Sequence, residues 1–306
     1  MAKRSGDTAL DSLTLRPCLL DPKRRRRYAL PAHSKSQMPQ LASADPIAFT
    51  IAGLDPSGGA GIIADIRTFI SLDCFPIAAI TSVTFQNASG VSGAQHLTAE
   101  TVRAQVLPLM EECDVACAKT GMLPTREIVV EVARLFRETN LPAPVVDTPI
   151  RSTSGYQLID DDAVEALINE LMPLARLITP NIPEAERLTG VRITDEDGMR
   201  RAAKAIREMG ARAVLIKGGH LREQGAGSRR QEAAAIDILD DEGRVTVFRG
   251  EWIEAGEVRG TGCMLSAAIA ACLGKGLSLE DSVREAKGFV ADAIAARLEF
   301  ASTNKP

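Results

Sequence analysis

The sequence predicts an α/β fold built on a mostly parallel central sheet, and three observations lead to this prediction. From Pro46 onward, short apolar runs alternate with helical patterns, which is typical of repeated strand-helix units. Polar or glycine-rich clusters follow the end of nearly every predicted strand. Late in the chain, the turn signal Asp240-Asp241-Glu242-Gly243 separates two apolar runs, so the sheet should gain an antiparallel edge hairpin.

The chain should divide near residue 44. Residues 1–44 combine an arginine run, Arg24 to Arg27, with Pro, Ser and Gln and show no sustained period, which is typical of a disordered tail. An RNA-binding or targeting arm is the alternative, and a further hypothesis is that translation starts at Met38. Mass spectrometry of the native N-terminus would decide this last point. Residues 45–300 should form one domain.

The predicted elements of this domain follow one another in strand-helix order. The β-branched residues of 77–85 favour a strand, Thr98 is a predicted helix cap, and acidic residues begin the helix at 160–174, as the helix dipole favours. Residues 235–239 and 245–248 flank the hairpin turn, and two helices close the chain. The other expected strands are 47–52, 115–120, 144–147, 177–179 and 213–217, and the other helices are 62–72, 98–113, 125–138 and 195–209. Residues 222–231 should form a surface loop.

Composition narrows the class of ligand. The chain has 306 residues and a net charge of −4, which gives no electrostatic footprint for nucleic acid, and it contains no apolar run long enough to span a bilayer. Six cysteines without paired metal-ligand spacing and only three histidines argue against a zinc enzyme. We therefore expect a cytoplasmic protein with reduced thiols and small-molecule partners.

The polar clusters at the strand ends predict a shared site. In open parallel α/β sheets, ligands bind beyond the carboxyl ends of the strands. Seven clusters fall at such positions or at the start of a late helix: residues 53–61, Gln86-Asn87, residues 119–122, Asp147, Asn181 with Glu184, residues 217–220 and residues 260–263. The glycines of the first cluster match neither a dinucleotide fingerprint nor a P-loop.

The loop Gly260-Thr261-Gly262-Cys263 opens an apolar helix of small residues. Unpaired backbone N–H groups and the helix dipole attract anions at such a position, and glycines allow close approach. The same field should lower the pKa of the Cys263 thiol. The alternative is a plain turn followed by a buried structural cysteine.

Gln86 and Asp65 are candidates for contacts with an organic substrate. The Gln86 amide both donates and accepts, which suits a heteroaromatic ring with an amino group beside a ring nitrogen. It could instead bond a loop backbone. Asp65, on the first helical turn after the glycines, should face either the same pocket or solvent.

Four further residues suit phosphates and a metal ion. Asn181 and Glu184 fit the indirect holding of Mg²⁺ through water, although Asn181 could instead cap the following helix. Lys217 could neutralise nucleotide phosphates, or it could extend its charge to solvent without a ligand. Asp147 is a metal or substrate candidate.

Together these residues resemble the hydroxymethylpyrimidine/phosphomethylpyrimidine kinases of thiamine biosynthesis, in the ribokinase-like superfamily. The resemblance covers about residues 47–298. It rests on six ordered motifs: A-G-x-D-P-S-G-G-A-G at residues 52–61, Q-N at 86–87, K-x-G-M at 119–122, T-P-N-x-P-E-A at 179–185, K-G-G-H at 217–220 and G-T-G-C at 260–263.

The resemblance implies a three-layer αβα sandwich and a homodimer that uses ATP and Mg²⁺. Such an enzyme phosphorylates 4-amino-5-hydroxymethyl-2-methylpyrimidine and then its monophosphate. The resemblance also implies that Gly53, Asp65 and Gln86 hold the pyrimidine. It further implies that Gly260, Thr261 and Gly262 form an anion hole beside Cys263, the general base. Lys217 and Asn181 would serve the ATP phosphates and Glu184 the metal, and Asp147 is a further metal candidate because of its place at a strand end.

Two departures from the family pattern concern substrate preference. Arg259 replaces a common histidine and should add positive charge near the transferred phosphate, and Leu54 replaces a commoner Ser or Thr. The alternatives are a pyridoxal/pyridoxine kinase of the same fold and a non-catalytic pyrimidine-binding regulatory protein. A thiol redox enzyme is disfavoured, because no C-x-x-C spacing surrounds Cys263.

Overall fold

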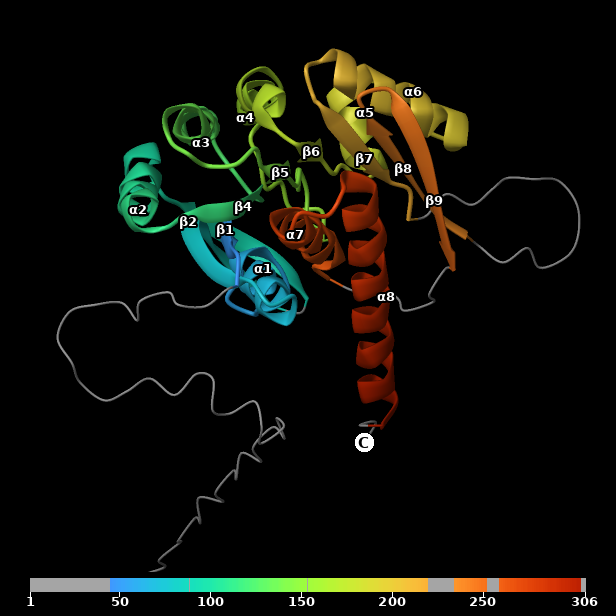
Figure 1. The fold of residues 1–306 in the computed structure, drawn as a ribbon, viewed down its shortest axis with the longest axis horizontal. Coiled ribbons are helices and arrows are strands. Elements are labelled where there is room, and N and C mark those ends of the chain that lie inside the picture. Colours follow the sequence, from blue (N-terminus) through green and yellow to red (C-terminus); the bar gives the residue numbers. More distant parts are fainter. Residues whose placement is uncertain (1–44, 88, 153, 220–233, 252–258, 304–306) are drawn as a thin grey trace, which may run out of the picture. The chain divides into compact units, whose positions relative to one another are not determined.

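The computed structural model describes residues 45–87, 89–152, 154–219, 234–251 and 259–303 (Figure 1). The predicted tail at residues 1–44 and the predicted loop at 222–231 lie outside these residues, as does His220. The division into a tail and one domain of residues 45–300 therefore stays a prediction.

The described residues form a nine-stranded sheet. Its strands from β2 to β7 are parallel, β3 is antiparallel to β2, and β8 and β9 form the predicted antiparallel hairpin at the other edge. Their order across the sheet is β3 (Gly90–His96), β2 (Phe75–Asn87), β1 (Ile47–Leu54), β4 (Val115–Thr120), β5 (Val145–Val146), β6 (Leu177–Ile178), β7 (Ala213–Lys217), β8 (Ala234–Asp241) and β9 (Arg244–Glu251).

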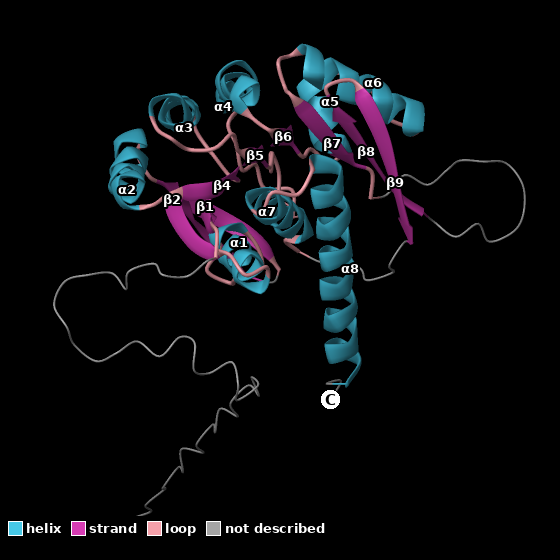
Figure 2. Cartoon of the chain, viewed as in Figure 1, coloured by secondary structure: helices cyan, strands magenta, loops and turns pink. Residues whose placement is uncertain are grey.

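Helices cover both faces of the sheet, which confirms the predicted three-layer sandwich (Figure 2). Alternating strand residues supply the two cores: in β7, Val214 and Ile216 pack with the first group of helices, and Ala213 and Leu215 pack with the second. The first group is α2 (Ala99–Glu112), α3 (Arg126–Glu138), α4 (Asp161–Ala166), α5 (Ile182–Thr189) and α6 (Glu196–Glu208). The second is α1 (Gly61–Ser71), α7 (Thr261–Gly274) and α8 (Leu279–Thr303).

Several element boundaries differ from the prediction. Strand β3 was not predicted, and β2 continues through Gln86-Asn87, so these residues end a strand instead of following one. The predicted helix at 160–174 changes to a π turn at Leu167–Leu171 and a 3₁₀ turn at Met172–Leu174. Pro173 has no N–H to continue an α-helical ladder. Thr98 caps α2 as predicted, by accepting a hydrogen bond from the N–H of Thr101.

Helix α7 carries the glycine loop toward the carboxyl ends of the strands. Its residues Ala267–Ala271 are fully buried, and small side chains allow the helix to lie close to the sheet. At its last residue, Gly274, an added Cβ would lie 2.9 Å from the Cys117 sulfur of β4. This close packing fixes where the helix begins. No helix in the described part of the chain is long and apolar enough to span a bilayer.

Candidate active site

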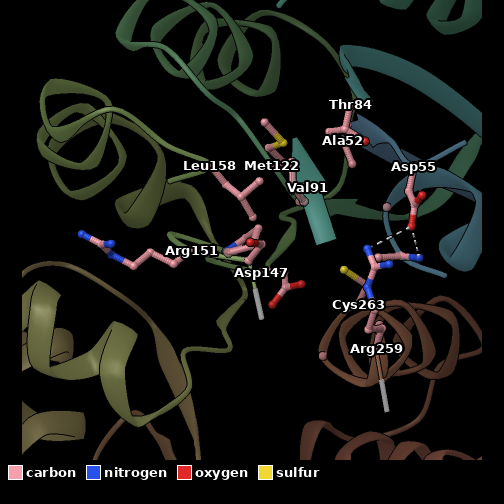
Figure 3. A pocket seen from close by; sticks show the side chains of 18 of the residues that line it. Ala52, Asp55, Thr84, Val91, Met122, Asp147, Arg151, Leu158, Arg259 and Cys263 are labelled. Atoms are coloured by element: carbon pink, nitrogen blue, oxygen red, sulfur yellow. Dashed lines mark hydrogen bonds and ion pairs between the residues drawn. The ribbon is translucent and has the colours of Figure 1, made fainter. Parts of the chain in front are cut away.

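The carboxyl ends of the parallel strands and the start of α7 line one cavity of about 310 Å³ (Figure 3). The structure thus brings together residues as far apart in the sequence as Ala52 and Cys263. Ten predicted site residues line the cavity: Gly53, Gln86, Asp147, Asn181, Glu184, Lys217, Arg259, Gly260, Gly262 and Cys263. The remaining two, Asp65 and Thr261, are not among its lining residues.

The glycine loop has the geometry of an anion site. Gly260 adopts a left-handed conformation with φ of 81°, and its carbonyl accepts the first helical hydrogen bond from the Met264 N–H. Gly262 faces Lys217, whose Nζ would lie 3.3 Å from an added Cβ. The backbone N–H groups at the start of α7 and a lysine ammonium are therefore brought to one corner of the cavity.

Gly260→Ala is expected to disturb this loop. The new Cβ would lie 1.9 Å from the carbonyl oxygen of Gly59, and the left-handed conformation costs a residue with a side chain about 1–2 kcal/mol. The first turn of α7 must then shift, and we expect any phosphoryl transfer to slow at least about 100-fold, the loss that removal of one anion-stabilising donor typically causes. Steady-state kinetics of the purified variant measures this loss. A rate within twofold of wild type would show that the loop does not face the reacting group.

Cys263 lines the cavity with intermediate exposure, and the expected fall in its thiol pKa is wrong. Burial raises the pKa of Cys263 to about 12, although the nearby charge of Lys119 and the N–H of Gly61 act in the opposite direction. Desolvation of the thiolate therefore outweighs the helix terminus. The sulfur is a neutral thiol at neutral pH, and it lies close enough to Asp147 to help lower the pKa of that carboxyl.

Lys217 and Asp147 form an ion pair at the floor of the cavity. Lys217 Nζ lies 3.2 Å from Asp147 Oδ1, and the Thr179 hydroxyl donates to the same oxygen at 3.4 Å. Although burial opposes ionisation of both groups, the pKa of Asp147 is lowered by Lys217 and Lys119, and the pKa of Lys217 is raised mainly by Asp147. Both groups are charged at neutral pH.

Asn181 and Glu184 form a capping box at the start of α5. The Asn181 side chain accepts from the Glu184 N–H, and Glu184 Oε2 accepts from the Asn181 N–H, each at 2.9 Å. The alternative interpretation of Asn181 as a helix cap is thus confirmed. Burial raises the pKa of Glu184 to about 7. Its charge and that of Asp147 oppose each other, so a cation would stabilise both.

The donor set fits Mg²⁺ better than a fully protein-ligated metal. Among the described residues, no group of three His, Cys, Asp or Glu side chains could hold a metal ion. Mg²⁺ usually keeps several waters and needs only one or two carboxylates together with substrate phosphates. Glu184 and Asp147 supply such carboxylates in the same cavity as Lys217.

Asp65 is fully buried behind the cavity instead of facing it. It accepts hydrogen bonds from Lys119 Nζ at 2.8 and 2.9 Å and from the Thr50 hydroxyl at 2.7 Å, and both members of the ion pair are 0% exposed. Lys119 does line the cavity. Lys119 belongs to the K-x-G-M motif, but its ion pair was not predicted, because Asp65 lies 54 residues away in the sequence and no local pattern links the two.

One wall of the cavity is built around Gln86. Its Nε2 donates to the Thr84 hydroxyl at 2.6 Å, and its Oε1 accepts from Arg259 at 2.5 Å. Arg259 also lies 3.9 Å from Asp55, a 2% exposed residue that binds the N–H groups of Ser57 and Ala60 (Figure 3). Gly53 lies on the same wall, where an added Cβ would be 3.1 Å from the Met122 sulfur.

No sequence pattern predicted that the segment between β5 and α4 would form a wall of the cavity. This segment contributes Arg151, Ser152, Ser154 and Leu158 to the cavity. Ser154 Oγ accepts from the N–H of Val91 at 3.3 Å, so the segment meets the start of β3. These residues follow no regular pattern, and their placement depends on contacts between distant segments.

Comparisons with known proteins agree with this arrangement. The model of the family described as phosphomethylpyrimidine kinase matches residues 55–306. A hydroxymethylpyrimidine/phosphomethylpyrimidine kinase from Rhizobium meliloti is 43% identical, over 85% of this chain and 95% of its own length. The corresponding protein from Streptomyces coelicolor is 42% identical, over 82% and 89%. The thiamine biosynthesis bifunctional protein ThiED from Geobacter sulfurreducens is 40% identical, over 80% of this chain and 48% of its own length.

Solved structures show the same similarity. The crystal structure of phosphomethylpyrimidine kinase from Clostridium difficile 630 has a TM-score of 0.70 and 36% identity, over 82% of this chain and 100% of that chain. The pyridoxal kinase from Staphylococcus aureus, in complex with AMP-PCP and pyridoxal, has a TM-score of 0.73 and 31% identity, over 82% and 88%.

Proposed function

The chain belongs to the phosphomethylpyrimidine kinase family, and on that premise we propose that it uses ATP to phosphorylate 4-amino-5-hydroxymethyl-2-methylpyrimidine and then its monophosphate, in thiamine biosynthesis. One observation in particular supports this proposal: a single cavity joins the glycine loop, Lys217 and Gln86. The proposed phosphate site at the glycine loop and Lys217 thus shares a cavity with Gln86, whose amide can hydrogen-bond a heteroaromatic ring.

Phosphoryl transfer depends mainly on positioning and on stabilisation of charge. The N–H groups at the start of α7 would receive charge that develops on the γ-phosphoryl group, and Lys217 would share it. Gln86 would orient the ring of the acceptor. Gly53, which packs too closely against Met122 to carry a side chain without a shift, lines the same cavity.

The hydroxymethyl proton must leave during the first transfer. Once the acceptor oxygen begins to bond phosphorus, its proton becomes strongly acidic, so a weak acceptor suffices. We place Cys263 Sγ as that acceptor, with the original thiol proton passing to the nearby Asp147 carboxylate. Asp147 thereby ends protonated and the sulfur is again a thiol. In this proposal, Asp147 acts with the thiol. The sequence had instead predicted that Asp147 binds the metal.

Glu184 and Asn181 would hold Mg²⁺, in part through water, and the ion would neutralise charge on the nucleotide phosphates. Glu184→Gln keeps an oxygen that can accept from the Asn181 N–H, so the helix cap survives while the charge is lost. We expect the Mg²⁺ concentration for half-maximal activity to rise about 10- to 100-fold, as for other changes around a bound metal. A Mg²⁺ titration at saturating ATP measures this shift. An unchanged midpoint would remove Glu184 from the metal site.

A pyridoxal kinase activity is the second candidate, because pyridoxal kinases are among the similar solved structures. An ATP consumption assay that offers hydroxymethylpyrimidine, its monophosphate and pyridoxal side by side separates the candidates. We expect turnover of both pyrimidines and a lower kcat/KM for pyridoxal. Turnover of pyridoxal alone would contradict the proposed function. The cytoplasmic location and the homodimer remain predictions.

A further inference from the structure

Arg259 joins two parts of the cavity that lie far apart in the sequence. Its guanidinium donates to the side-chain oxygen of Gln86 at 2.5 Å and also to the backbone carbonyl of Asn87. The side chain is 23% exposed and lines the cavity. Since Arg259 immediately precedes Gly260, one guanidinium connects the glycine loop to the end of β2.

Thr84 holds the other end of the same amide. The Thr84 hydroxyl donates to the backbone carbonyl of Leu54 at 2.9 Å, so it can only accept from Gln86 Nε2, which lies 2.6 Å away. A guanidinium is only a donor, so it must face the amide oxygen. The two neighbours therefore fix which end of the Gln86 amide is oxygen and which is nitrogen.

With its orientation fixed, the Gln86 amide presents a fixed arrangement of hydrogen-bond donors and acceptors to a ligand. A glutamine amide has two N–H donors and two lone pairs on its oxygen, and the bonds to Thr84 and Arg259 account for one of each. One N–H and one lone pair remain for a molecule in the cavity that Gln86 lines. An amino group beside a ring nitrogen offers the complementary donor and acceptor.

We propose that Arg259 is a specificity-determining positioning residue, which orients the Gln86 amide to select an aminopyrimidine over a pyridine acceptor. A hydroxymethyl-bearing pyridine lacks an amino group next to its ring nitrogen, so it cannot use both remaining positions of the amide. This inference rests on the proposed function, and it assigns Arg259 to the acceptor wall instead of to the ATP phosphates, where the sequence placed it.

The test compares Arg259→Ala with Arg67→Ala. Arg67 also donates to a loop carbonyl, that of Gly58 at 2.9 Å, but it is exposed and is not among the residues that line the cavity. Without Arg259 the amide must be ordered on binding, so we expect the KM for hydroxymethylpyrimidine to rise about 5- to 20-fold. The kcat and the KM for ATP should stay within about twofold of wild type. Arg259→Lys should recover part of the affinity, and Arg67→Ala should change none of these values.

Two readouts separate this role from a structural one. Calorimetric titration of hydroxymethylpyrimidine without ATP should show the same loss of affinity in Arg259→Ala, and the preference in kcat/KM over pyridoxal should fall. Should Arg259→Ala fail to fold, Thr84→Val removes the other restraint on the amide, and we expect the same rise in acceptor KM. A higher KM for ATP or a lower kcat with unchanged acceptor KM would overturn the inference and leave the proposed function intact. A wild-type protein that phosphorylates no aminopyrimidine would instead overturn the proposed function itself.

Discussion

Cys263→Ala is expected to slow phosphorylation of the hydroxymethyl alcohol about 10²- to 10⁴-fold, the usual contribution of a positioned proton acceptor. Phosphorylation of the monophosphate should stay within about tenfold of wild type, because its attacking oxygen is already anionic and has no proton to lose. The asymmetry follows from the proposed relay, in which Cys263 Sγ receives a proton only in the first transfer. Single-turnover rates measured separately with each acceptor report it directly.

Cys263→Ser is the matched variant for this experiment. A hydroxyl can donate to the nearby Asp147 carboxylate and can pass a proton along the same path, so first-step activity should be intermediate between wild type and Cys263→Ala. Thermal melting of both variants controls for folding. Equal losses in both steps would show that Cys263 supports the anion site and does not carry the proton.

Local chemistry made most of the fold predictable. Thr98 accepts a hydrogen bond from an N–H three residues away, and residues 213–216 form an unbroken apolar run, so neither assignment depends on distant contacts. Strand β3 was missed because Gly90–His96 contains two glycines and no alternating β-branched residues, and its pairing with β2 comes from the chain reversal before it.

The candidate site was predictable only as far as topology determines it. Parallel strands carry their carboxyl ends to one edge of the sheet, and this places Asp147, Glu184 and Lys217 in one cavity without further information. The pKa values of the site residues depend on how deeply each side chain is buried, and a sequence does not show this. Cys263 was expected near its helix terminus as a thiolate, but its burial outweighs that field. Asp65 was expected at the cavity, but it pairs with Lys119 behind the cavity wall.

This buried pair leads to the largest expected effect on stability. Lys119→Met replaces the cation with an apolar side chain of similar length and leaves Asp65 without its charge partner, although the Thr50 hydroxyl still donates to it. Breaking a buried ion pair by removing one partner typically costs about 3–5 kcal/mol. We expect a loss of this size in the free energy of unfolding, measured by urea denaturation at pH 8.

The double variant Asp65→Asn with Lys119→Met tests whether the loss comes from the unpaired charge. Both charges are then absent, while the Asn oxygen can still accept from Thr50, so the double variant should be more stable than Lys119→Met alone by about 2 kcal/mol or more. A double variant less stable than Lys119→Met would mean that lost packing, and not the isolated carboxylate, causes the destabilisation.

The pH dependence of Lys119→Met has a defined sign. Burial raises the pKa of Asp65, and the positive charge of Lys119 opposes that shift in the wild type. The Lys119→Met variant lacks this opposing charge. A carboxyl whose folded pKa lies above the unfolded value of about 3.9 favours the folded state below that value, and this stabilisation is lost as the pH rises through the folded pKa. The variant should therefore lie closer to wild type at pH 4.5 than at pH 8, when both proteins are measured at both values. A gap that stays the same would show that Asp65 is protonated throughout or that its charge finds another partner, and the cost assigned to the isolated carboxylate would not hold.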